Sequence, residues 1–177
     1  MEWLNEPPTW EPTGDVITVV SGASTDFWRR THDGGVRDTG HFYHQPVSGD
    51  FEVEVLVAGE YRDLYDQAGL MVRFDETTWL KCGIEFVNQV QHASAVVTRE
   101  FSDWSVVPLP NNPPAVRMRV TRHEGTFEVH YSVGAGAQTL LRQAFLTEAP
   151  IVSVGLMCAS PAGEGFSTRF QGFGLRT

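Results

Sequence analysis

Residues 79–86 read Trp79-Leu80-Lys81-Cys82-Gly83-Ile84-Glu85-Phe86 and contain the only lysine of the chain. Successive side chains of a β-strand point to opposite faces, so a period of two sorts these residues into two sets. One face is apolar and is predicted to pack in a core; it carries Leu80, Cys82, Ile84 and Phe86. The other face combines an aromatic ring, a cation and a carboxylate around a glycine; it carries Trp79, Lys81, Gly83 and Glu85. Such a mixture is typical of a face that holds a polar ligand.

The same alternation recurs along the chain in short segments that are separated by turn-forming Gly, Asp and Asn residues. The alternating segments are 16–20, 50–57, 68–74, 79–86, 93–98, 116–122, 126–133, 140–146, 152–159 and 166–175. No segment has a sustained helical period. The pattern therefore predicts an all-β fold in which two antiparallel sheets pack as a β-sandwich. The proline-rich segment 108–114 is expected to carry the chain between the sheets, and residues 1–177 are expected to form a single domain.

The formal net charge of −9 argues against a nucleic-acid backbone or an anionic membrane surface as a partner. No apolar stretch approaches the roughly 20 residues of a membrane-spanning helix, and residues 1–8 lack the features of a secretion signal. The two cysteines, Cys82 and Cys158, both fall on the apolar parity of their strands. We expect them to be buried thiols, and we expect a cytoplasmic protein.

Most motifs that would identify a catalytic site are absent from the sequence. There is no phosphate-binding glycine loop, no Gly-x-Ser-x-Gly elbow and no Cys-x-x-Cys pair. His41 and His44 are three residues apart, so on a strand they point to opposite faces and cannot easily share a metal. We therefore expect no cofactor and no metal site.

Two acidic residues, Glu52 and Glu54, project from one face of a predicted strand, about 7 Å apart. Retaining glycoside hydrolysis needs two carboxyl groups roughly 5 Å apart, which makes a catalytic role one interpretation of this pair. The other interpretation is a pair of solvated carboxylates, because Leu56 stands where a third alternating acid would fall.

The candidate ligand-binding residues lie between positions 65 and 105. They are Gln67, Trp79, Lys81, Glu85, Asp103 and Trp104. If their strands are neighbours, these side chains gather on one concave surface, and Gly69 and Gly83 would let a ligand approach the backbone. Lys81 and Glu85 are about 13 Å apart along the strand, too far to pair directly, so each is expected to pair with a neighbouring strand, Lys81 for example with Asp66 or Asp103. The alternative is a set of cross-strand charge pairs that only fixes the register of the sheet.

Several blocks of the chain together are similar to one protein family. They are Asp26-Phe27-Trp28, His41-Phe42, Gly49-Asp50-Phe51-Glu52, Asp66-Gln67-Ala68-Gly69-Leu70, residues 79–85, Val97-Thr98, Ser102-Asp103-Trp104-Ser105, and the run from Gly155 to Pro161 followed by Gly165-Phe166 and Phe170. The chain resembles, over almost its whole length, the regulation-of-enolase-protein-like family of unassigned function. That resemblance implies a jelly roll of the concanavalin-A-like lectin and glucanase type, and it supplies no catalytic residues.

Three functions are compatible with the sequence. The first is binding of a carbohydrate or sugar-derived molecule, with Trp79 and Trp104 stacking on the ring and Gln67, Lys81, Glu85 and Asp103 bonding its polar rim. Lys81 suggests a ligand that carries a carboxylate or a phosphate. The second is a glycoside hydrolase or related enzyme that uses Glu85 with Glu52, Glu54 or Asp103. The third is a regulator that docks a protein partner and has no small-molecule ligand.

Overall fold

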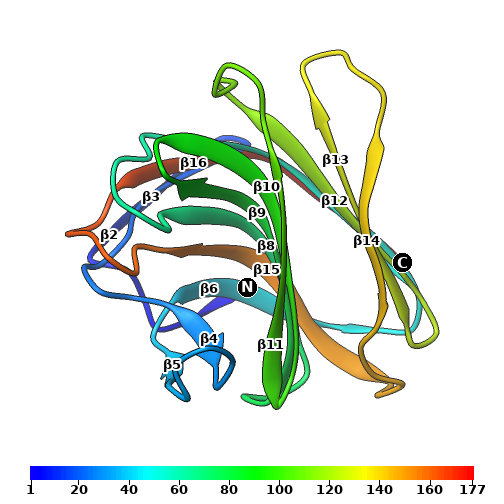
Figure 1. The fold of residues 1–177 in the computed structure, drawn as a ribbon. Helices are drawn as coiled ribbons and strands as arrows, with labels where there is room; N and C mark the ends of the chain where they lie inside the picture. Colours follow the sequence, from blue (N-terminus) through cyan, green and yellow to red (C-terminus); the bar gives the residue numbers. More distant parts are fainter.

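The computed structural model describes all residues, Met1 to Thr177, and contains only strands, turns and loops. Sixteen strands form two seven-stranded antiparallel sheets and one separate hairpin. No helix is present that would be long and apolar enough to cross a membrane. The predicted two-sheet antiparallel β-sandwich is confirmed (Figure 1).

The sheet that carries the candidate residues is called the front sheet, and its strand order is β1-β6-β15-β8-β9-β10-β11. Its strands are β1 (Glu2–Leu4), β6 (His41–Ser48), β15 (Ile151–Ala159), β8 (Gln67–Arg73), β9 (Thr78–Val87), β10 (Val90–Arg99) and β11 (Phe101–Pro108). The back sheet has the order β14-β13-β12-β7-β16-β3-β2. Its strands are β14 (Thr139–Phe145), β13 (Thr126–Val133), β12 (Val116–His123), β7 (Phe51–Gly59), β16 (Ser167–Arg176), β3 (Val16–Val20) and β2 (Thr9–Thr13).

The core lies between the two sheets, where alternate residues of each strand meet. A cluster of 28 buried hydrophobic residues fills this space. It includes Leu80, Cys82 and Ile84 of β9, together with Val53, Val55 and Val57 of β7. The period of two in these strands therefore identifies the buried face correctly, and it leaves the opposite parity of β9 on the outer face of the front sheet.

Each alternating segment of the sequence overlaps one strand, but two long strands of the front sheet were not predicted. They are β6 and β11, whose sequences His41–Ser48 and Phe101–Pro108 mix polar and apolar residues without a clear period. The segment Pro108–Pro114 does carry the chain from β11 in the front sheet to β12 in the back sheet, as predicted.

A hairpin of β4 (Phe27–Arg29) and β5 (Val36–Asp38) lies against the outer face of the front sheet. The front sheet curves around this hairpin, so the outer face is its concave side (Figure 1). Phe27 packs there in a second cluster of buried residues, together with Phe42, Met71, Trp79, Val96 and Met157. The hairpin thus converts one part of an exposed sheet face into a small additional core.

Candidate functional site

Strands β8, β9 and β10 bring the polar residues of the outer face together. Their register pairs Gln67 with Glu85, Met71 with Lys81, and Ser94 with Gly83. Side chains that are directly opposite on neighbouring strands lie on the same face of a sheet. Gln67, Lys81, Glu85 and Ser94 therefore share the outer face of the front sheet, as the sequence predicts for the first three.

Glu85 is the centre of a small hydrogen-bond network. Its Oε2 atom accepts a hydrogen bond of 2.6 Å from the Ser94 hydroxyl and one of 2.8 Å from the Trp104 indole N–H. Glu85 is only 7% exposed, so these two donors replace water at one of its carboxylate oxygens. The same contact fixes the orientation of the Trp104 ring, which is 41% exposed and has Tyr65 beside it, with ring centroids 6.1 Å apart.

Lys81 is buried, and its ammonium group holds the hairpin. Its Nζ donates a hydrogen bond of 2.6 Å to the backbone carbonyl of Phe27 and lies 3.3 Å from Oδ1 of Asp26. The prediction that Lys81 pairs with Asp66 or Asp103 is wrong. Asp66 is itself buried in a loop, where it accepts hydrogen bonds from backbone N–H groups and from Ser160. The true partner lies 55 positions earlier in the chain, in a segment whose placement strand parity does not determine.

Trp79 is on the predicted face but is not open to a ligand. It is 1% exposed, because Phe27 of the hairpin packs edge-on against it with ring centroids 6.3 Å apart. The Lys81 ammonium also lies 5.8 Å from the centre of the Trp79 ring. Trp79 therefore supports the hairpin, and Trp104 is the aromatic residue of the candidate set that faces solvent.

Asp103 lies apart from the other candidate residues. It neighbours Trp104 on β11, and adjacent strand residues point to opposite faces. Its carboxylate is 78% exposed and lies 3.5 Å from the Arg142 guanidinium of β14, on the back sheet. Asp103 thus links the edges of the two sheets and does not join the outer face.

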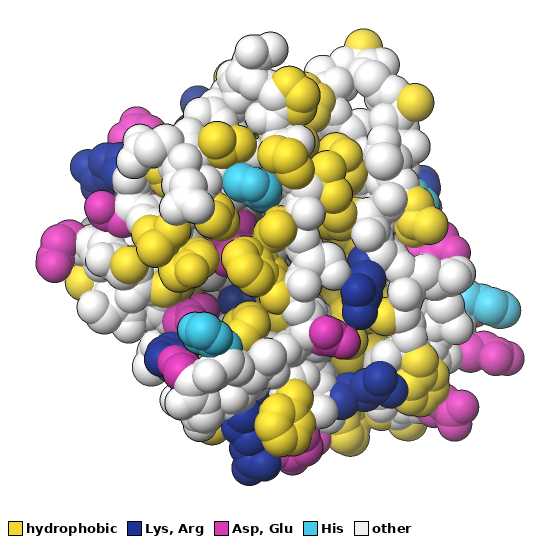
Figure 2. Space-filling view, viewed as in Figure 1, with side chains coloured by type: hydrophobic (Ala, Val, Ile, Leu, Met, Phe, Trp, Pro, Cys, Tyr) yellow, Lys and Arg dark blue, Asp and Glu magenta, His cyan; other side chains and the backbone are white.

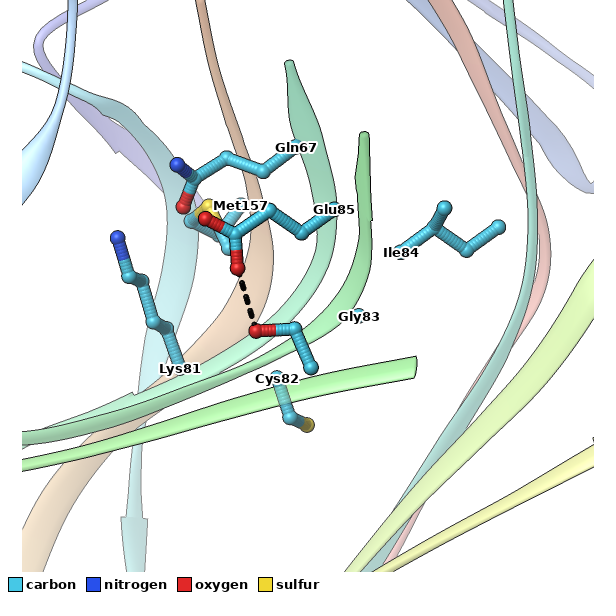
Figure 3. Close-up of a pocket in the computed structure, with 8 residues that line it drawn as sticks. Gln67, Lys81, Cys82, Gly83, Ile84, Glu85 and Met157 are labelled. Atoms are coloured by element: carbon cyan, nitrogen blue, oxygen red, sulfur yellow. Dashed lines mark hydrogen bonds between the residues drawn. The ribbon is translucent and has the colours of Figure 1, made fainter. Parts of the chain in front are cut away.

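A small cavity lies on the outer face of the front sheet. The cavity is lined by Gln67, Lys81, Glu85, Ser94 and Met157. The head groups of Gln67, Lys81 and Glu85 point toward one another (Figure 3). Cys82 and Ile84 point away from the cavity, toward the core. The cavity volume is about 10 Å³, which is room for one water-sized group. The face around it is hollowed and rich in apolar atoms, with charged groups only partly visible between them (Figure 2).

Sequence reasoning missed three residues of this site: Asp26, Tyr65 and Ser94. Ser94 offered a signal, because it is a polar residue between Ala93 and Ala95 on the outer parity of its strand. Asp26 and Tyr65 lie outside the alternating segments, so their positions follow only from the folded chain.

The sequence suggested that Gly69 and Gly83 make room for a ligand, but this prediction is wrong. They are opposite each other in the register of β8 and β9. A Cβ atom on Gly69 would lie 1.9 Å from the carbonyl oxygen of Cys82, and one on Gly83 would lie 2.0 Å from that of Ala68. The space above each glycine is therefore occupied by the neighbouring strand.

The remaining acidic and histidine candidates lie elsewhere. Glu52 and Glu54 project from the back sheet, where both contact Arg176 and Glu52 also contacts Arg119. Neither glutamate therefore shares a cleft with Glu85. His41 and His44 lie on opposite faces of β6, since His41 bonds Gly22 and Asn5 while His44 stacks on Phe42 of the outer face.

Comparisons with known proteins give a consistent picture. A family described as "Protein of unknown function (DUF1349)" matches residues 3–177. A Saccharomyces cerevisiae protein named "Regulation of enolase protein 1" is 35% identical over 173 residues, which cover 98% of this chain and 87% of that protein. The resemblance seen in the sequence is thereby confirmed. A crystal structure of a functionally unknown protein from Saccharomyces cerevisiae superposes with a TM-score of 0.94 at 35% identity and covers 99% of this chain and 95% of that chain.

More distant solved structures share the fold alone. The carbohydrate-binding module CBM66 from Bacillus subtilis has a TM-score of 0.63 at 12% identity, covering 99% of this chain and 95% of that chain. The Bacteroides ovatus xyloglucan PUL GH43B structure has a TM-score of 0.72 at 19% identity, covering 94% of this chain and 34% of that chain. These similarities support the β-sandwich architecture and assign no residue a role.

Proposed function

Because the chain belongs to the family described as proteins of unknown function, DUF1349, its function must be inferred from its site, and we propose that it binds a carbohydrate or sugar-derived molecule on the outer face of the front sheet. The observation that carries this proposal is the position of Trp104. Its ring is exposed, its orientation is fixed by the bond to Glu85, and it stands beside a cavity lined by Gln67 and Lys81.

This arrangement matches the chemistry of a sugar. A sugar ring offers an apolar face to an aromatic side chain and a rim of hydroxyl groups to amide, carboxylate and ammonium groups. In the proposed complex the ring lies against Trp104, while Gln67, Lys81 and Glu85 bond one end of its rim. Trp79 and Asp103 have structural roles in this proposal, because Trp79 packs against the hairpin and Asp103 pairs with Arg142 at the edge of the sandwich.

The proposed setting is cytoplasmic, with a regulatory role in carbohydrate metabolism. The relative's name, "Regulation of enolase protein 1", supports the regulatory role. Both cysteines are free thiols buried in the core, which suits a reducing compartment. Hydrolysis by two carboxylates receives no support, because Glu52, Glu54 and Asp103 all lie away from the face that carries Glu85.

The test is a binding screen with matched variants. Mono- and oligosaccharides and sugar phosphates are screened for thermal stabilisation of the protein, and each hit is measured by calorimetry. A ligand at 100 times its dissociation constant should add about 2.7 kcal/mol of stability. Trp104→Ala should weaken binding about tenfold, because the stacking surface is lost. Glu52→Gln, on the back sheet, is the control and should bind as the unmodified protein does. If no sugar binds, or if Trp104→Ala binds equally well, the proposal fails.

A second candidate function is docking of a protein partner, and the edge of the front sheet favours it. Strand β11 has a neighbour on one side only, and Phe101, Trp104, Val106 and Val107 along it are exposed. An exposed apolar edge strand is a ready site for strand addition by another chain. Purified enolase, suggested by the relative's name, is the first partner to test by size-exclusion chromatography. Val107→Lys should abolish such a complex while leaving sugar binding intact, and a complex that persists in this variant would argue against the edge.

A further inference from the structure

The hydrogen-bonding atoms that the protein leaves unused in the cavity define what can enter it. The side-chain amide of Gln67 donates from Nε2 to the carbonyl of Tyr65 at 3.2 Å, so its Oε1 acceptor is left for a ligand. Both hydrogen bonds to Glu85 end on Oε2, so Oε1 of that carboxylate is also left. Lys81 uses two of its three N–H donors on Phe27 and Asp26 and retains one.

The unused set therefore contains two acceptors, Gln67 Oε1 and Glu85 Oε1, and two donors, the third N–H of Lys81 and the second N–H of the Gln67 amide. The Ser94 hydroxyl does not add a donor, because its proton is already committed to Glu85. A group that fits this set must donate two hydrogen bonds and can accept up to two. Two neighbouring hydroxyls of a sugar do so: one donates to Glu85 and accepts from Lys81, and the other donates to Gln67.

The charges around the cavity point the same way. The positive charge of Lys81 is matched by Asp26, at 3.3 Å. Arg73, on the same face, is held by a bidentate contact with Asp38 at 2.6 and 2.8 Å. Glu85 has only neutral donors, Ser94 and Trp104, so its negative charge is the one that no cation balances.

From these two observations we infer that the site selects an uncharged pair of neighbouring hydroxyl groups and rejects a phosphate or carboxylate. The inference rests on the proposed function and deepens it. A phosphate or carboxylate offers only acceptor oxygens, which would face the unused oxygens of Glu85 and Gln67 in a space nearly closed to water. The lone lysine therefore serves the hairpin and does not mark an anion site, contrary to what the sequence suggested.

The size of the cavity sets how the ligand enters. With room for one water-sized group, the cavity admits a single hydroxyl. The adjacent hydroxyl and the ring stay at the mouth, on the side where Trp104 is exposed. A phosphate group, with its tetrahedral set of oxygens, is larger than this space.

The experiment compares neutral sugars with their charged derivatives in matched sets. Glucose, galactose, mannose and fructose, together with their methyl glycosides, are each paired with the corresponding sugar phosphate, and the aldoses also with their uronate. Dissociation constants are measured by calorimetry and by NMR titration of the tryptophan indole signals. We expect the neutral member of each binding set to be at least about tenfold tighter than its anionic partners, which corresponds to about 1.4 kcal/mol.

Two variants test the electrostatic cause. Glu85→Gln removes the unbalanced charge, and Asp26→Asn leaves the Lys81 charge without its partner; each should reduce the preference for the neutral member about tenfold. Glu52→Gln should leave the preference unchanged, and thermal unfolding of each variant verifies that it is folded. Tighter binding of an anionic member by the unmodified protein would overturn this inference but leave the proposed function standing. If no member of any set binds, the proposed function fails and this inference fails with it.

Discussion

Replacing Lys81 with methionine should destabilise the protein, because the ammonium group fastens the β4–β5 hairpin to the front sheet. Lys81 is 4% exposed, and its side chain reaches Asp26 and the carbonyl of Phe27. Removing one partner of a buried ion pair typically costs about 3–5 kcal/mol, since the other charge is left without compensation. The Asp26 side chain remains 15% exposed, so we expect a loss near the lower end, about 3 kcal/mol.

The measurement is urea-induced unfolding in a double-mutant cycle. Lys81→Met, Asp26→Asn and the double variant are compared with the unmodified protein. In the double variant no charge is left unpaired, so the two single costs should exceed the combined cost by about 1–3 kcal/mol. For a chain of this length, a loss of 3 kcal/mol corresponds to a decrease of about 6–12 °C in the melting temperature.

Glu52→Gln is the control for the loss of one charged group. Glu52 also makes ion pairs, but on the partly exposed outer face of the back sheet, where such pairs contribute about 0–1 kcal/mol. Lys81 does not fasten the hairpin if Lys81→Met costs no more unfolding free energy than this control, or if the costs of the two single variants simply add.

Three further predictions test other parts of the structure. Gly83→Ala should cost more than about 3 kcal/mol in unfolding free energy, because its Cβ would lie 2.0 Å from a backbone carbonyl, whereas Gly134→Ala, in open space, should cost about 1 kcal/mol. Burial lowers the pKa of His41 in the folded protein, so the stability that its neutral form contributes should be fully present above pH 6.5 and should be lost as the pH falls through the lowered pKa. In urea unfolding, His41→Gln should therefore show a smaller loss of unfolding free energy between pH 7 and 5 than the unmodified protein. Burial raises the pKa of Cys82 to about 12 and that of Cys158 as well, so a thiol reagent should label both cysteines only after unfolding.

The fold was predictable because the core of a sandwich imposes one simple rule on its strands. Residues such as Val53, Val55 and Val57 must face the other sheet, so their alternation is visible in the sequence. Strand β11 escaped the rule because it lies at the edge of the front sheet, where both faces are partly open to solvent. The hairpin was not predicted because Phe27 is buried on the outer face of the front sheet, in a cluster that lies outside the core between the two sheets.

The candidate site was predictable only as far as strand parity reaches. Parity places Gln67, Lys81 and Glu85 on one face, and the structure has them there. It says nothing of which side chains another segment covers, so Trp79 and Trp104 were indistinguishable. They differ because Phe27 covers Trp79, and that contact joins residues 52 positions apart. Glycine gave a second ambiguity, since a missing side chain serves the approach of a neighbouring strand as well as that of a ligand.

The hairpin determines how much of the outer face remains for a ligand, and Lys81 connects the two parts. One side of this lysine fastens Phe27 and Asp26, while its remaining donor lines the cavity. A change at position 81 therefore alters stability and binding together, and a loss of ligand in that variant would not identify a binding residue. Glu85 has no contact with the hairpin among its hydrogen bonds, which reach only Ser94 and Trp104. Glutamine at position 85 keeps the size of the side chain and an acceptor oxygen for those two donors, so it is the change that separates ligand recognition from folding.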